Sequence, residues 1–140
     1  MKLVVTDASI WVSRLVPEDS FHEMIKAWMT ARRNDTQERT EFLAPSLLLA
    51  EIGGAISRRT GKPALGLRAV EQIKAVPGLR LIDMDRALTE IAANLAAELG
   101  MRGADSLYVA VAARLNLPLA TLDVDQRTRA ATKIGIIDFH

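Results

Sequence analysis

Four acidic residues of this chain stand in or beside apolar segments, where a folded protein does not readily accept a charge. They are Asp7 after residues 3–6, Glu51 within 47–52, Asp105 before 106–111 and Asp123 after 119–122. A buried carboxylate without a partner is costly, so it protonates or finds a cation. Carboxylates placed in this way predict one shared metal site. Oxygen ligands suit hard cations such as Mg²⁺ or Mn²⁺, which usually act on phosphates.

The composition is that of a folded protein. Apolar residues make up 49% of the chain and charged residues 25%, which predicts a single domain spanning residues 1–140. The absence of cysteine excludes disulfides, thiolate nucleophiles and cysteine-based zinc sites. The two histidines, His22 and His140, are both expected at the surface, so a serine–histidine–aspartate triad has no good candidate.

The charge pattern also restricts the partners and the compartment. A formal net charge of +1 gives no strong overall attraction to nucleic acid, so any such binding needs a local cluster of arginine or lysine. The N-terminal apolar run is too short for a signal peptide. The longest apolar stretch, residues 43–56, contains Glu51 and is too short to span a bilayer. We therefore expect a cytoplasmic protein that does not bind membranes.

Apolar runs alternate with helical patterns along the chain. Strands are predicted at residues 3–6, 42–44, 79–82, 119–122 and 134–137, separated by helices or helix pairs, with a polar loop over residues 32–41. This alternation predicts an α/β fold with a mainly parallel sheet of roughly five strands. Ligands of such sheets bind beyond the carboxyl ends of the strands, where Asp7 and Asp123 fall.

Each acid also has a plainer interpretation. Asp7, Asp105 and Asp123 all precede predicted helices and can serve as N-caps. Glu51 is harder to explain, because it lies within a helix whose neighbouring positions are apolar. The glycines at positions 53 and 54 predict a close approach to that helix, either by another helix of the chain or by a second subunit.

Four parts of the sequence together resemble a PIN domain: residues 5–9, the helix with Glu51, residues 103–108 and residues 121–123. The length and order of elements resemble stand-alone VapC-type toxins. The resemblance implies a three-layer α/β/α fold and a Mg²⁺- or Mn²⁺-dependent endoribonuclease. It matches the metal-binding and catalytic acids of the family to Asp7, Glu51, Asp105 and Asp123. It assigns supporting roles to Ser9 and Thr121, and Asp125 is either a fifth acid or a solvated residue in the first turn of a helix.

The resemblance also implies partners and a mechanism. No histidine, cysteine or lysine is placed as a nucleophile, so hydrolysis requires a water activated by one or two metal ions. Arg14 and Arg102 are the best candidates for binding RNA phosphates, because each is close in sequence to an expected metal ligand. The expected partners are RNA, a cognate VapB-type antitoxin and a second copy of the chain in a homodimer.

Two alternatives to this function remain open. A non-catalytic PIN module that binds RNA or protein should have lost some of the acids, yet all four are present here. A metal-dependent phosphatase on a related α/β fold is the second alternative. Phosphatases of the haloacid-dehalogenase type need Asp-x-Asp after the first strand, whereas this chain has Asp7-Ala8-Ser9.

Overall fold

The computed structural model describes residues 1–139, which form a parallel sheet covered by helices on both sides. The strands are β1 (Lys2–Thr6), β2 (Thr40–Pro45), β3 (Leu79–Ile82) and β4 (Leu119–Ala120). They lie in the order β3-β2-β1-β4, and every pairing is parallel. Both central strands are buried along most of their length, as expected when helices cover both faces of a parallel sheet.

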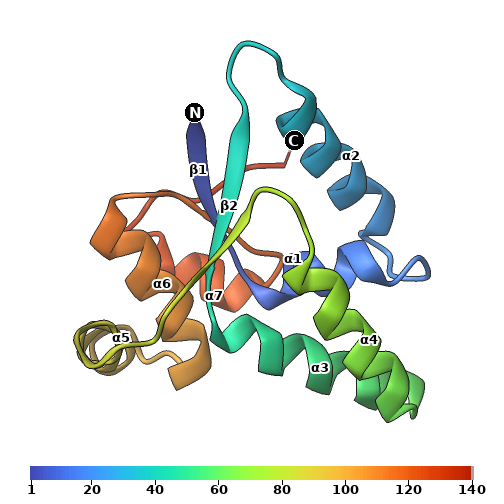
Figure 1. The fold of residues 1–140 in the computed structure, drawn as a ribbon. Coiled ribbons are helices and arrows are strands. Elements are labelled where there is room, and N and C mark those ends of the chain that lie inside the picture. The colour runs from blue at the N-terminus through green and yellow to red at the C-terminus, as the bar shows by residue number, and fades with distance from the viewer. Residues whose placement is uncertain (140) are drawn as a thin grey trace.

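The helices fill the two outer layers. They are α1 (Ala8–Leu15), α2 (His22–Asn34), α3 (Leu47–Thr60), α4 (Pro63–Lys74), α5 (Arg86–Leu99), α6 (Gly103–Leu115) and α7 (Val124–Ala130). Helices α5 and α6 lie on one side of the strands and α1, α2 and α4 on the other, with α6 packed against β1 and β2 (Figure 1). This arrangement confirms the predicted α/β fold. Within residues 1–139, no helix has the length and apolar character needed to cross a membrane.

The direction of the chain reverses beside β1. From β1 it proceeds through β2 to β3, and it then returns to place β4 on the opposite side of β1. The carboxyl ends of β1 and β4 therefore flank the switch point, the usual position of a ligand crevice in an open parallel sheet. Asp7 directly follows β1, and Asp123 follows β4 after two residues.

Two predicted boundaries are wrong. The segment 32–41 is not a continuous loop, because α2 continues to Asn34 and β2 begins at Thr40. The guanidinium of Arg32 lies 5.5 Å from the centre of the Trp28 ring, a contact that helps to hold the last turn of α2. The segment 134–137 forms only an isolated bridge, between Leu119 and Ile136, because β4 is too short to support a longer ladder.

Both histidines were expected at the surface, and one of them lies within the described residues. His22 is buried rather than exposed, and its Nδ1 lies 2.8 Å from the carbonyl oxygen of Ser13. The hydrogen bond joins the start of α2 to α1, which explains how the imidazole is accommodated. His140 lies outside the described residues.

The glycines of α3 allow close packing within the chain. A Cβ atom built on Gly66 of α4 would lie 2.7 Å from the carbonyl oxygen of Gly53, and one built on Gly53 would lie 3.1 Å from a methyl carbon of Val70. The element that approaches Gly53 is therefore α4, so the close approach comes from another helix of the chain, which was one of the two predicted alternatives. A Cβ on Gly54 would instead meet the guanidinium of Arg58 from the same helix, at 3.0 Å.

Candidate active site

Asp7 is the most enclosed acid of the chain. It caps the N-terminus of α1 at the carboxyl end of β1, and only 5% of its surface is exposed. Its Oδ1 accepts hydrogen bonds from Ser9 Oγ at 2.6 Å and from the amide of Ile10 at 3.3 Å, while its Oδ2 accepts one from Thr121 Oγ1 at 2.5 Å. Burial raises the pKa of Asp7 to about 6, although these hydrogen bonds act in the opposite direction.

A buried hydrogen-bond network links Asp7 to Asp105 and Asp123. The hydroxyl of Thr121 also lies 3.1 Å from Gln126 Oε1 and accepts a bond from the amide of Asp123 at 3.0 Å. The Nε2 of Gln126 donates to the carbonyl of Asp105 at 3.3 Å, and its backbone amide donates to Asp123 Oδ1 at 3.1 Å. Thr121 and Gln126 thus fix the relative positions of the three segments that carry acids.

Gln126 was not identified from the sequence. It is 1% exposed, which is unusual for a glutamine and requires hydrogen-bond partners of the kind described. Its only signal in the sequence is its position three residues after Asp123, where the backbone of a capped helix turns back toward the cap.

Asp105 and Asp123 share an arginine. Arg102 Nε lies 3.6 Å from Asp105 Oδ2, and its Nη2 lies 4.0 Å from Asp123 Oδ2. Burial raises the pKa of Asp105, the guanidinium of Arg102 lowers it, and the charges of Asp123 and Asp125 raise it further.

Asp105 belongs to the first turn of α6 and is not its N-cap, so the capping interpretation is wrong there. It is right for Asp7 and Asp123, whose side chains cap α1 and α7.

Glu51 is held by a tyrosine that the sequence did not single out. The phenol of Tyr108, a residue 1% exposed, donates a hydrogen bond to Glu51 Oε1 at 2.5 Å. Burial raises the pKa of Tyr108 far above its ordinary value, and the negative charges of Glu51, Asp7 and Asp105 add to this effect. The phenol therefore stays protonated as a donor, and these three acids all lie close enough for their charges to act on it.

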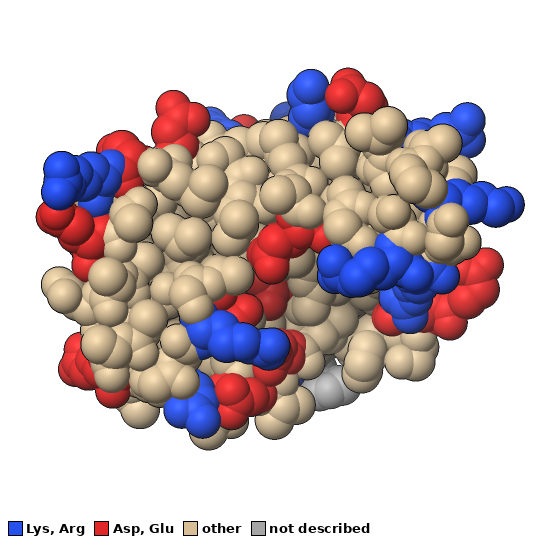
Figure 2. Space-filling model, turned by 90° about the horizontal axis from the view of Figure 1, so that it is seen from below, with Lys and Arg blue, Asp and Glu red and all other residues tan. Residues whose placement is uncertain are grey.

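The acids gather at one end of the molecule. Seen from the end where the strands finish, acidic side chains fill a central hollow, and groups of basic side chains lie on either side of it (Figure 2).

Of the supporting residues predicted from the sequence, Ser9 and Thr121 contact Asp7 directly. The side chain of Asp125 is 72% exposed and pairs with Arg129 at 3.0 Å, which agrees with the solvated alternative.

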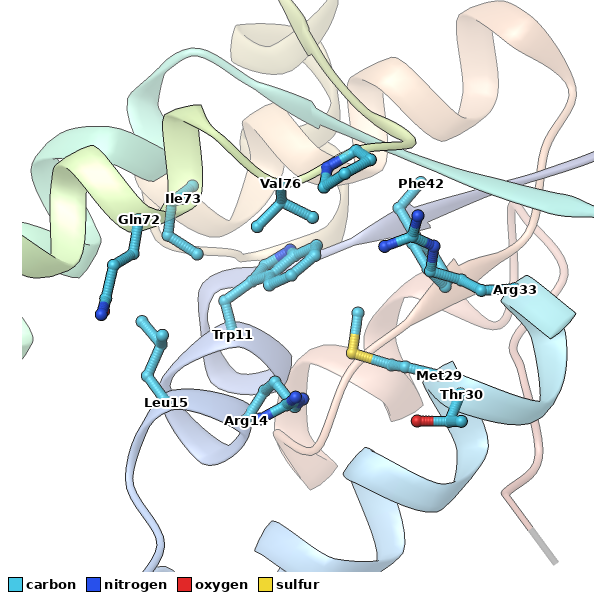
Figure 3. A pocket seen from close by; sticks show the side chains of 11 residues that line it. Trp11, Arg14, Leu15, Met29, Thr30, Arg33, Phe42, Gln72, Ile73 and Val76 are labelled. Atoms are coloured by element: carbon cyan, nitrogen blue, oxygen red, sulfur yellow. The ribbon is translucent and has the colours of Figure 1, made fainter.

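Arg14 lies elsewhere. It lines a hollow of about 270 Å³ enclosed by α1, α2, β2 and α4, with Trp11, Met29 and Phe42 among its apolar walls. The side chains of Arg14 and Arg33 enter this hollow from different helices (Figure 3). Of the two arginines proposed to bind phosphate, only Arg102 contacts the acids.

The chemistry of these donors fits a hard divalent ion. They are carboxylate oxygens, and burial makes the ionised forms of Asp7 and Asp105 unfavourable unless a cation lies nearby. Among residues 1–139, however, no three acidic or histidine side chains are arranged to share one ion. Each acid is engaged instead by a partner from the protein: Thr121 for Asp7, Tyr108 for Glu51, and Arg102 for the remaining pair.

A family model described as a PIN domain matches residues 4–131. The chain belongs to the PIN-domain family. This confirms the resemblance stated from the four acidic segments. No curated protein matches the chain significantly.

Solved structures share the fold of this PIN domain. VapC20 of Mycobacterium tuberculosis, a sarcin–ricin loop cleaving toxin, is 18% identical with a TM-score of 0.74, over 89% of this chain and 93% of that one. DNA-bound VapBC from Salmonella typhimurium is 17% identical with a TM-score of 0.72, over 100% of both chains. VapBC2 from Rickettsia felis, bound to a fragment of its promoter, is 16% identical with a TM-score of 0.72, over 96% and 97%. At these identities the likeness concerns the fold.

Proposed function

We propose that this PIN domain is a metal-dependent endoribonuclease and the toxin of a type II toxin–antitoxin pair. One observation carries the proposal: buried Asp7, at the switch point of the sheet, is joined through Thr121 and Gln126 to the segments of Asp105 and Asp123. A structural cap needs no such network. The RNA-cleaving activity named for the Mycobacterium tuberculosis toxin supports the same function.

In this proposal Asp7, Glu51, Asp105 and Asp123 are the residues that would hold Mg²⁺ or Mn²⁺. The ion, when bound, lowers the pKa of a water and offsets negative charge on the phosphate. Ser9 and Thr121 fix both oxygens of Asp7, and Tyr108 fixes one oxygen of Glu51. These contacts limit the rotation of the carboxylates, so that less ordering remains to be done when substrate binds.

Arg102 has two tasks in this mechanism. Its guanidinium offsets the charges of Asp105 and Asp123 in the metal-free protein. Its side chain is 83% exposed, so it is free to turn outward and would bind an RNA phosphate.

The proposed protein partner is an antitoxin, since several similar structures are toxin–antitoxin complexes. We propose that the antitoxin binds in the hollow between α1, α2 and α4. The walls of this hollow are apolar, and the guanidiniums of Arg14 and Arg33 lie beside them (Figure 3). A segment with an apolar side chain and a nearby carboxylate would fit it. We expect the Arg33→Glu variant to weaken the complex with the cognate antitoxin, measured by calorimetry. We also expect a homodimer, measured by sedimentation.

Nuclease activity is the direct test. Purified protein should cleave single-stranded RNA with Mn²⁺ or Mg²⁺, EDTA should stop the cleavage, and Asp105→Asn should abolish it while the protein remains folded. Asp35→Asn is a matched control, because Asp35 is exposed in the loop before β2. Undiminished cleavage by Asp105→Asn would refute the assignment. RNA binding without cleavage would favour a non-catalytic module, and hydrolysis of p-nitrophenyl phosphate alone would favour a phosphatase.

A further inference from the structure

A second hollow borders the acidic site. It has a volume of about 500 Å³ and lies between the start of α2, the β4–α7 connection and the segment 136–139. Leu122 and Val124 form part of its wall, and they flank Asp123 in the chain. A molecule that lies across Asp123 therefore has this hollow directly beside it.

The walls of the hollow are mostly apolar and partly exposed. Phe21 is 46% exposed and Val124 is 68% exposed. Among the aromatic residues within 1–139, Phe21 alone has an exposed side chain. Phe139, also in the wall, is fixed by an edge-to-face contact with Trp28, with 5.1 Å between the ring centres. Exposed apolar surface of this kind in a concave place is typical of a binding site.

One positively charged side chain, partly buried, lies among these apolar groups. Arg127 donates from Nη2 to the carbonyl of Thr121 at 3.3 Å, but its Nε–H is buried and has no hydrogen-bond partner among the described residues. A buried donor without an acceptor is costly and rare in folded proteins. The guanidinium is thus held in place by its contact with Thr121, and the side chain of Arg127 lines the hollow.

We propose that this hollow receives one unpaired base of the RNA substrate, next to the phosphate that is cleaved. Phe21 supplies a face for stacking, and Arg127 donates to a carbonyl or ring nitrogen of the base. A phosphate fits less well, because the walls are apolar and the acidic side chain of Asp138 also lines them. The inference rests on the proposed ribonuclease function and adds to it a site that distinguishes unpaired from paired RNA.

The test compares RNA with a chain that lacks bases. Binding is measured by fluorescence anisotropy in the Asp105→Asn background, which prevents cleavage. The two probes are a short single-stranded RNA of mixed sequence and a base-free ribose phosphate chain of the same length. The protein should bind the RNA at least about five-fold more tightly than the base-free chain, as expected for one stacked base.

The variants separate base binding from other roles. Phe21→Leu keeps an apolar side chain but removes the aromatic face, and Arg127→Met removes the donors. Each should reduce the preference for the base-bearing probe and leave the affinity for the base-free chain unchanged. Leu67→Ala and Arg114→Gln are controls, since both residues are exposed and neither lines the hollow. Arg127→Met also loses its hydrogen bond to Thr121, so the melting temperature of this variant is measured in parallel. If Arg127→Met unfolds, the test relies on Phe21→Leu.

The failures can be told apart. If wild-type protein cleaves RNA but the Asp105→Asn protein binds both probes equally, the base site is refuted and the ribonuclease function stands. If wild-type protein neither cleaves nor binds RNA, both proposals are refuted. If Phe21→Leu weakens the complex with the cognate antitoxin and leaves RNA binding intact, the hollow receives protein and the base site is again refuted.

Discussion

Replacing Asp7 by asparagine should stabilise the metal-free protein at neutral pH. The folded protein buries this carboxylate, and burial raises its pKa from the ordinary 3.8 to about 6. Asparagine carries no charge and has nearly the same shape. Its Oδ1 can accept from Ser9 and Ile10, and its amide can donate to Thr121, whose own proton is then free for Gln126 Oε1.

The size of the effect follows from the shift of the pKa. A rise of about two units corresponds to roughly 3 kcal/mol of unfolding free energy, at ~1.4 kcal/mol a unit. Because the folded pKa is the higher one, the folded state binds more protons between pH 3.8 and about 6. The stabilising contribution is complete below that window and is lost as the pH rises through it. At about pH 8, Asp7→Asn should therefore melt roughly 10 °C above wild type, and the difference should disappear by about pH 4.

Thermal melts in EDTA across this pH range measure the effect, with Asp35→Asn as the control of opposite sign. Hydrogen bonds from the amides of Glu38 and Gln37 lower the pKa of Asp35, so its contribution is lost as the pH falls. Added Mn²⁺ should raise the melting temperature of wild type much more than that of Asp7→Asn. The reasoning fails if Asp7→Asn melts below wild type at neutral pH, or if its advantage does not shrink on acidification.

Four further predictions concern single contacts. Tyr108→Phe removes the hydrogen bond to Glu51, and we expect RNA cleavage at saturating substrate to fall at least ten-fold with little change in KM; an unchanged rate would show that the bond is dispensable. Thr121→Val leaves buried partners unsatisfied and should cost ~1–3 kcal/mol of unfolding free energy in urea melts, whereas exposed Thr128→Val should change little. Arg102→Ala should bind Mn²⁺ several-fold more tightly in electron paramagnetic resonance titrations and should raise KM for RNA; weaker Mn²⁺ binding would contradict a competing role. Gly66→Ala places a methyl group against the Gly53 carbonyl and should destabilise the protein by ~1–3 kcal/mol, while Gly103→Ala, which has open space, should not.

The acids could be found in the sequence because charge conflicts with apolar surroundings. Asp7 and Asp123 follow short apolar runs, and such runs in an alternating chain predict parallel strands whose carboxyl ends share one edge. The β-strand order was not available from this pattern, since it does not show on which side of β1 the chain returns. That order decides which acids become neighbours.

Gln126 and Tyr108 were missed for a different reason. The only local signal of Gln126 is its spacing from Asp123. Tyr108 lies in an apolar run, which indicates burial but does not identify the partner of its hydroxyl. Their roles depend on contacts between separate elements, Tyr108 with Glu51 across 57 positions and Gln126 with Asp105 across 21. The burial of His22 and the extension of α2 to Asn34 likewise depend on packing against other elements.

The hydrogen bond between Thr121 and Asp7 joins positions 114 residues apart, so this pair is completed late during synthesis. A ribosome adds about 5–20 residues each second, and β1 must wait for several seconds as an edge strand before β4 can pair with it. A nascent chain that has not yet reached Thr121 lacks both Asp123 and the donor that fixes Asp7. For the proposed nuclease, this order of events would delay activity until translation is nearly finished. Ribosome-bound chains arrested before Thr121 should show no RNA cleavage, and cleavage by such chains would show that the late pairing is not required.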